Sequence, residues 1–133
     1  MKILVAEDEV DYRSALCEAL ELSGHSVKSV SNGVDAFRCL EIEQFDLIIS
    51  DINMPNRTGS QLHEMIRRVE HLKDIPFIYI TGLAVLRLTT PVDSNGLDFV
   101  MGKTAFDRLL KLVEDISLHR SNLREDRIAL GWF

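Results

Sequence analysis

Short apolar runs alternate along this chain with longer segments in which apolar residues recur at helical spacing. The apolar runs cover residues 3–6, 47–50, 77–81 and 97–101, and residues 26–30 alternate between apolar and polar as a shorter strand does. In the intervening segments, apolar residues lie three and four positions apart, as on one face of a helix. The pattern therefore predicts five short strands separated by helices.

Four segments have a spacing typical of amphipathic helices: residues 10–22, 34–40, 60–70 and 104–120. Thr58 or Ser60 suits the N-terminus of the third of these helices. Thr104, followed three positions later by Asp107, resembles a capping box at the start of the last one. Residues 83–95 are expected to form a further helix that is short or irregular, because proline inside a helix costs about 3 kcal/mol and Pro91 lies within this segment.

Apolar strands separated by helices are typical of a parallel sheet that is covered on both faces. Because crossover connections are right-handed, few topologies remain. We expect an α/β fold with a doubly wound five-stranded parallel sheet in the order 2-1-3-4-5, a flavodoxin-like three-layer sandwich. Residues 1–120 would form this single domain, and residues 121–133 would be a C-terminal tail or an extension of the last helix.

Composition supports one globular domain and excludes several classes of partner. The 133 residues are 46% hydrophobic and 27% charged, which is ordinary for a soluble protein. The net charge of −6 argues against direct nucleic-acid binding and against an anionic membrane surface. No run approaches the ~20 apolar residues of a membrane span, and no signal peptide is evident, so we expect a cytoplasmic protein. Cys17 and Cys39 have no metal-ligand spacing and are expected to be buried free thiols.

Acidic residues follow two of the predicted strands at the point where each ends. Glu7 and Asp8 come directly after the first strand, and Asp51 comes after the third. In the expected strand order these two strands are neighbours, so their carboxyl ends meet where such folds place ligands. Like charges repel, so we expect a cation between them. Mg²⁺, which prefers oxygen ligands, and Lys103 after the last strand are the two candidates.

Four segments, each at the end of a predicted strand, resemble the signature segments of receiver domains of two-component response regulators, and the chain is chemotaxis-receiver-like up to about residue 120. These segments are Val5-Ala6-Glu7-Asp8, Ser50-Asp51-Ile52-Asn53-Met54-Pro55, Ile80-Thr81-Gly82 and Gly102-Lys103. The resemblance implies that Asp51 is a phosphoacceptor, which takes a phosphoryl group from a histidine kinase or phosphotransfer domain. It also implies that the protein switches an interface with a downstream effector, and that it catalyses only its own phosphorylation and dephosphorylation.

The same resemblance implies a magnesium site. Asp8 and Asp51 would bind Mg²⁺ directly, together with the backbone carbonyl of Asn53. Glu7 would bind the ion through water, which suits an ion that keeps part of its hydration shell.

Two further residues receive roles in phosphoryl transfer from the resemblance. Lys103 would pair with Asp51 before transfer and with a phosphoryl oxygen after it, and the Thr81 hydroxyl would donate to another phosphoryl oxygen. Movement of Thr81 and of the loop that follows it would then bias a two-state element.

The chain departs from the usual receiver pattern near its last strand. Receivers usually have proline after the lysine, often with a cis bond, whereas Thr104 stands here and a trans bond is expected. They also carry an aromatic switch residue three positions before the lysine. Here that position is Val100, and Phe99 lies one place earlier, where a strand presents the opposite face.

Other readings remain open at this point. A pseudo-receiver would act as a phosphorylation-independent binding or dimerisation module, and a homodimer is compatible with either reading. A Mg²⁺-dependent phosphohydrolase on a related fold usually carries Asp-x-Asp after its first strand, whereas this chain has Glu7-Asp8-Glu9. A flavin-binding protein is disfavoured, because an acidic turn would repel the flavin phosphate.

Overall fold

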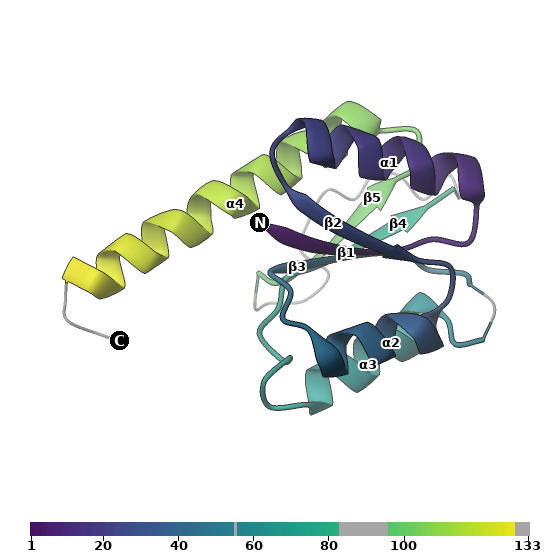
Figure 1. The fold of residues 1–133 in the computed structure, drawn as a ribbon, viewed down its shortest axis with the longest axis horizontal. Coiled ribbons are helices and arrows are strands. Elements are labelled where there is room, and N and C mark those ends of the chain that lie inside the picture. The colour runs from purple at the N-terminus through teal and green to yellow at the C-terminus, as the bar shows by residue number, and fades with distance from the viewer. Residues whose placement is uncertain (55, 83–95, 130–133) are drawn as a thin grey trace.

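The five predicted strands form one parallel sheet in the order β2-β1-β3-β4-β5, as expected. The computed structural model describes residues 1–54, 56–82 and 96–129, with the side chains of the last helix described as far as residue 119. The helices and strands, shown in Figure 1, are β1 (Lys2–Ala6), α1 (Val10–Leu22), β2 (Ser26–Val30), α2 (Gly33–Ile42), β3 (Leu47–Asp51), α3 (Gly59–Arg68), β4 (Phe77–Thr81), β5 (Asp98–Gly102) and α4 (Phe106–Ala129).

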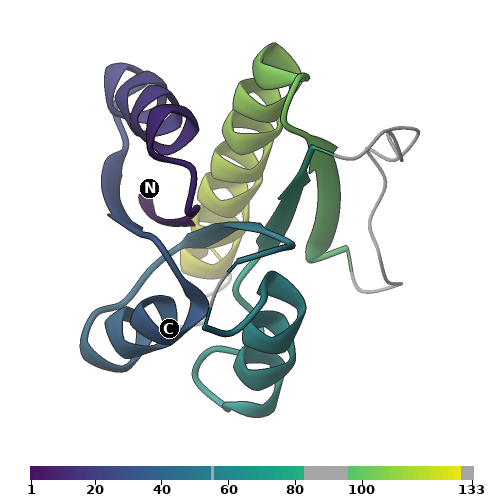
Figure 2. The same ribbon diagram turned by 90° about the vertical axis from the view of Figure 1, so that its right-hand side faces the viewer.

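The sheet is the middle of three layers. Helices α1 and α4 cover one face and α2 and α3 cover the other, as Figures 1 and 2 show. Alternate residues of β1 point to opposite faces, so Ile3 packs in the core beneath α1 and α4 while Leu4 packs in the core above α2 and α3. Strands β3 and β4 are buried along their whole length. These continuous apolar runs are therefore explained by helices on both sides.

Strand register brings the candidate residues to one edge of the sheet. Ala6 at the end of β1 lies opposite Ser50 of β3, so the residues that follow each of them are neighbours in space. At the other side, Thr81 at the end of β4 pairs with Gly102 at the end of β5. All four strands end at this edge, as parallel strands must, which positions the acids, the threonine and the lysine around one point.

The two predicted helix caps have different outcomes. Thr58 is the N-cap of α3 and forms a capping box with Gln61, whereas Ser60 lies inside the helix. The capping box predicted at Thr104 is wrong, because α4 begins only at Phe106. The Ala105 amide donates to the Gly102 carbonyl in a turn, and the Ala105 carbonyl accepts from Leu109 as the helix begins. Thr104 is exposed in that turn.

Helix α4 runs to Ala129, so residues 121–129 extend the last helix, which was one of the two alternatives predicted for this segment. Its last turns extend beyond the sheet in Figure 1. The irregular helix expected over residues 83–95 lies outside the described residues. Among the residues that the structure describes, no helix is both long and apolar enough to span a membrane. The two cysteines are free thiols, as expected. They are half-buried, whereas buried thiols were expected.

Candidate functional site

Three carboxylates from two strand ends converge at the carboxyl edge of the sheet. One oxygen each from Glu7, Asp8 and Asp51 lies within 4.8 Å of the others. Glu7 is completely buried and Asp51 is only 7% exposed, whereas Asp8 is exposed. Two acids therefore form the buried floor of the site, and the third lies at its solvent side. A ligand could enter from that side.

The Lys103 ammonium lies between these acids. Its Nζ is 2.8 Å from Glu7 Oε1, 3.0 Å from Asp51 Oδ2 and 3.5 Å from Glu9 Oε2. Burial would lower the pKa of Lys103, but its hydrogen bonds to Glu7 and Asp51 prevail and raise that pKa above its ordinary value. Lys103 is therefore a fixed positive charge at any physiological pH.

Glu7 is held in place by its backbone as well as by its side chain. Its amide donates to the Val30 carbonyl at 3.0 Å, and its carbonyl accepts from the Arg13 guanidinium at 2.7 Å. Oε1 accepts from Lys103 and from the Glu9 amide. Burial raises the pKa of Glu7, and the hydrogen bond from Lys103 opposes that rise. Within the described residues, buried Oε2 has no hydrogen-bond partner, so it is open to a ligand.

The charge balance of the site favours a divalent cation. Glu7, Asp8, Glu9 and Asp51 bring four carboxylates together, and Lys103 is the ammonium that contacts three of them. Carboxylate oxygens at this spacing, one of them without a partner, are the donors that hard divalent ions prefer. The residues present therefore fit such an ion.

Asp51 is the last residue of β3, and the loop that follows it is folded tightly against it. The Asn53 amide donates to Asp51 Oδ1 at 3.2 Å, and the Ser50 hydroxyl donates to the Asp51 carbonyl at 2.9 Å. A Cβ at Gly59 would lie 2.1 Å from the Asp51 carbonyl oxygen, so only glycine fits at that position. The loop thus leaves the Asp51 carboxylate oriented between Asn53 and Lys103.

Thr81 and Gly82 complete the rim beside Lys103. Thr81 is 4% exposed, and its carbonyl accepts from the Lys103 amide at 2.9 Å, which ties the ends of β4 and β5 together. Among the described residues, none has an atom within 4 Å of where a Cβ at Gly82 would lie. The structure therefore places all of the predicted site residues at one edge of the sheet.

Two residues that contact Lys103 were not identified from the sequence. Glu9 is the third acid around the ammonium, and the Tyr12 ring has Lys103 Nζ 5.1 Å from its centroid. Tyr12 is the third residue of α1, and no spacing rule relates it to a lysine that lies 91 positions later. No spacing rule distinguishes Glu9 from an ordinary solvated acid.

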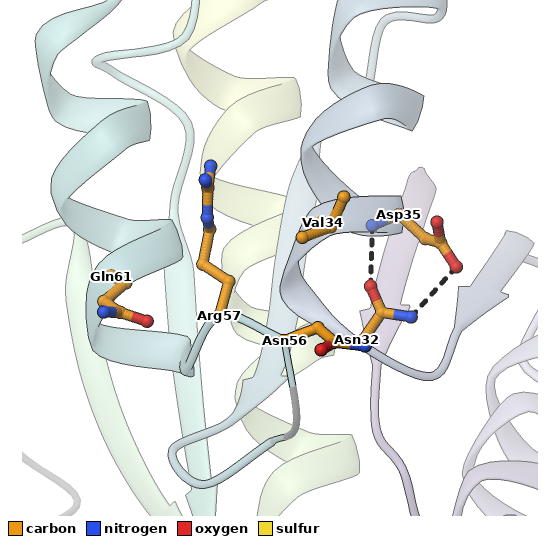
Figure 3. A pocket seen from close by; sticks show the side chains of 6 residues that line it. All are labelled: Asn32, Val34, Asp35, Asn56, Arg57 and Gln61. Carbon is orange, nitrogen blue, oxygen red and sulfur yellow. Dashed lines mark hydrogen bonds between the residues drawn. The ribbon is translucent and has the colours of Figure 1, made fainter.

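A separate pocket of about 510 Å³ lies between the N-terminal ends of α2 and α3 (Figure 3). Asn32, the N-cap of α2, uses its side chain there to accept from the Asp35 amide and to donate to the Asp35 carboxylate. The Asn32 and Asp35 side chains drawn in Figure 3 thus serve local capping. The pocket is lined by Asn32, Val34, Asp35, Asn56, Arg57 and Gln61.

Comparisons with known proteins agree with this geometry. A sequence profile described as the response regulator receiver domain matches residues 3–120. The response regulator receiver protein CpdR of Brucella abortus is 36% identical over 93 residues, which cover 70% of this chain and 76% of CpdR. The sensor histidine kinase RcsC of Escherichia coli is 29% identical over 127 residues, which cover 96% of this chain but only 13% of RcsC. The chain thus spans a small part of that longer relative.

A solved structure is similar over most of the chain. The response regulator TrrA of Thermotoga maritima, in complex with Mg²⁺ and BeF, has a TM-score of 0.72 and 29% sequence identity. The match covers 86% of this chain and 97% of TrrA. The similarity therefore extends over most of this chain and nearly all of TrrA.

Proposed function

The chain belongs to the response regulator receiver domain family, and from that premise we propose that Asp51 is its phosphoacceptor and that Mg²⁺ is its cofactor. The observation that carries this proposal is the Asp51 carboxylate itself. One of its oxygens is held by the Lys103 ammonium and the other by the Asn53 amide, next to the acids of the β1 end. This is an oriented nucleophile beside a cation, and phosphoryl transfer depends on positioning and on cations.

Three acids and one backbone carbonyl would bind the metal ion. Asp8 and Asp51 would bind Mg²⁺ directly with the Asn53 backbone carbonyl, and Glu7 would contact it through water. The bound ion would neutralise negative charge on the transferred phosphoryl group. The structure of TrrA with Mg²⁺ and BeF supports this assignment by similarity.

The chemical step follows from the position of Asp51. A carboxylate oxygen of Asp51 attacks the phosphorus of a phosphohistidine, the phosphorus–nitrogen bond breaks, and the imidazole nitrogen that leaves takes a proton from solvent. Lys103 then exchanges its contact with the carboxylate for a contact with a phosphoryl oxygen, and the Thr81 hydroxyl donates to another. The product is an acyl phosphate on Asp51, and its hydrolysis by water restores the carboxylate.

The partners follow from the same proposal. A histidine kinase or phosphotransfer domain supplies the phosphoryl group in the cytoplasm, and a downstream effector protein or domain reads the changed surface. Nothing among the described residues favours the pseudo-receiver alternative, because the acids, the threonine and the lysine are all assembled.

The readout differs from an aromatic switch at position 100. Phe99 packs on the core beneath α1 and α4, whereas Val100 packs on the core of α2 and α3, so the two residues serve opposite faces of the sheet. Rotation of Phe99 therefore cannot replace an aromatic side chain at Val100.

The test is phosphorylation by a small donor. The full chain is incubated with acetyl phosphate and Mg²⁺, and intact-protein mass spectrometry measures the gain of one phosphoryl group. We expect the gain in wild type and in Asp115→Asn, a matched control in an exposed position on α4, but not in Asp51→Asn. An equal gain in Asp51→Asn, or no gain in wild type, would overturn the proposal.

A further inference from the structure

Resting on the proposed function, we propose that Tyr12 is a positioning residue, whose ring holds the Lys103 ammonium above Asp51 for phosphoryl transfer. Tyr12 lies in the first turn of α1 and is half-buried beside the acid cluster. Lys103 Nζ is 5.1 Å from the centroid of its ring, within the distance of a cation–π contact. Tyr12 does not touch the acceptor and acts through the lysine.

The Tyr12 ring packs against a second aromatic ring. Tyr12 and Phe106 meet edge to face, with ring centroids 6.1 Å apart and an interplanar angle of 88°. Phe106 is the first residue of α4, three positions after Lys103. The Lys103 ammonium therefore lies over the Tyr12 ring, and that ring is held by Phe106 of α4, the helix that follows Lys103 in the chain. This arrangement couples the start of α1 to the start of α4 through the site.

Three carboxylates attract the ammonium in different directions, which makes a positioning group necessary. Glu7 draws it toward the buried floor and Glu9 toward solvent, while Asp51 is the residue on which it must act. The face of an aromatic ring attracts a cation anywhere within about 6 Å of the ring centroid. The ammonium can therefore leave the Asp51 carboxylate for a phosphoryl oxygen and still remain over Tyr12.

The ring, and not the hydroxyl, carries this role. Within the described residues the buried Tyr12 hydroxyl oxygen has no hydrogen-bond partner. Burial raises the pKa of Tyr12 to about 12, so the hydroxyl stays neutral and adds no charge to the site. Phenylalanine should therefore replace tyrosine without losing the effect.

The experiment compares phosphorylation rates with acetyl phosphate at saturating Mg²⁺, together with Mg²⁺ affinity by calorimetry. We expect Tyr12→Leu to slow phosphorylation about fivefold, equal to about 1 kcal/mol, and to leave Mg²⁺ affinity within about twofold. Tyr12→Phe should restore the wild-type rate. Tyr12→Met serves as a second ring-deleting variant if Tyr12→Leu does not fold.

A matched control exists at the other end of the sheet. Lys2 Nζ lies 5.1 Å from the centroid of the Phe45 ring, and Phe45 is buried away from the acids. Phe45→Leu also removes a ring from a cation–π pair and from the core, so it should reduce stability but not the phosphorylation rate. A general structural effect would instead slow both variants.

The double variant decides whether Tyr12 acts through the lysine. In a Lys103→Ala background, Tyr12→Leu should cause no further decrease in rate. A wild-type rate for Tyr12→Leu, or the same fivefold decrease in the Lys103→Ala background, would overturn the positioning role while leaving Asp51 as acceptor. A wild-type protein that gains no phosphoryl group would overturn the proposed function and this role with it.

Discussion

Replacement of Lys103 by methionine removes the ammonium and keeps most of the apolar side chain. Glu7 and Asp51, whose oxygens lie 2.8 and 3.0 Å from Nζ, then lose their counter-charge. Glu7 is completely buried, and burial already raises its pKa, so in the variant it should take up a proton rather than stay charged. The loss of stability in Lys103→Met therefore cannot exceed the free energy needed to protonate Glu7.

That limit depends on pH. For an ordinary glutamate pKa of about 4.3, protonation requires about 3.7 kcal/mol at about pH 7 and about 1.6 kcal/mol at about pH 5.5. The folded variant holds a proton that the unfolded chain has released, so its stability falls as pH rises from the unfolded pKa toward the raised folded pKa. We expect Lys103→Met to lose about 3 kcal/mol at about pH 7 but only about 1 kcal/mol at about pH 5.5.

The assay is urea unfolding in the presence of a chelator at both pH values. Lys111→Met, which removes an exposed lysine on α4, is the matched control and should change stability by less than about 0.5 kcal/mol at either pH. An equal loss for Lys103→Met at both pH values would refute the reasoning, because the penalty would then not come from a carboxylate that can protonate.

Three more results are expected. Gly59→Ala should lower stability by about 1–3 kcal/mol in urea titrations, because its Cβ would meet the Asp51 carbonyl, whereas Gly82→Ala, whose Cβ would meet no atom of the described residues, should fold normally; equal effects would contradict this. Mg²⁺ affinity by calorimetry should fall as pH is lowered, because Glu7, with its raised pKa, takes up a proton that competes with the ion; a pH-independent affinity would exclude this. Thr58→Ala should cost about 1 kcal/mol of thermal stability through loss of the capping box, and an unchanged melting temperature would contradict it.

The strand order and the three layers could be predicted because each depends on patterns that are local in the chain. A continuous apolar run such as residues 47–50 requires cover on both faces, and right-handed crossovers leave few possible orders of the strands. Thr58 was one of two caps predicted from the sequence, and the structure selects it because its partner Gln61 lies three residues away. Such signals need no knowledge of the rest of the fold.

Features that depend on distant backbone could not be predicted. Thr104 has the sequence of a cap, but the pairing of β4 with β5 continues to Gly102, so the turn is completed at Ala105 and the helix begins later. The pairing of Lys103 with Asp51 was expected, whereas its shorter contact with Glu7 depends on how deeply that acid is buried. Burial of one side chain beneath others is a property of the assembled layers.

The phosphoacceptor assignment of Asp51 is tested most directly by locating the modified residue. Protein treated with acetyl phosphate and Mg²⁺ is reduced with borohydride, which converts an aspartyl phosphate to homoserine, and the digested peptides are sequenced by mass spectrometry. The account predicts homoserine at position 51 in the peptide that contains Ser50 and Ile52. Homoserine at Asp8 or at another carboxylate, with position 51 unchanged, would contradict it.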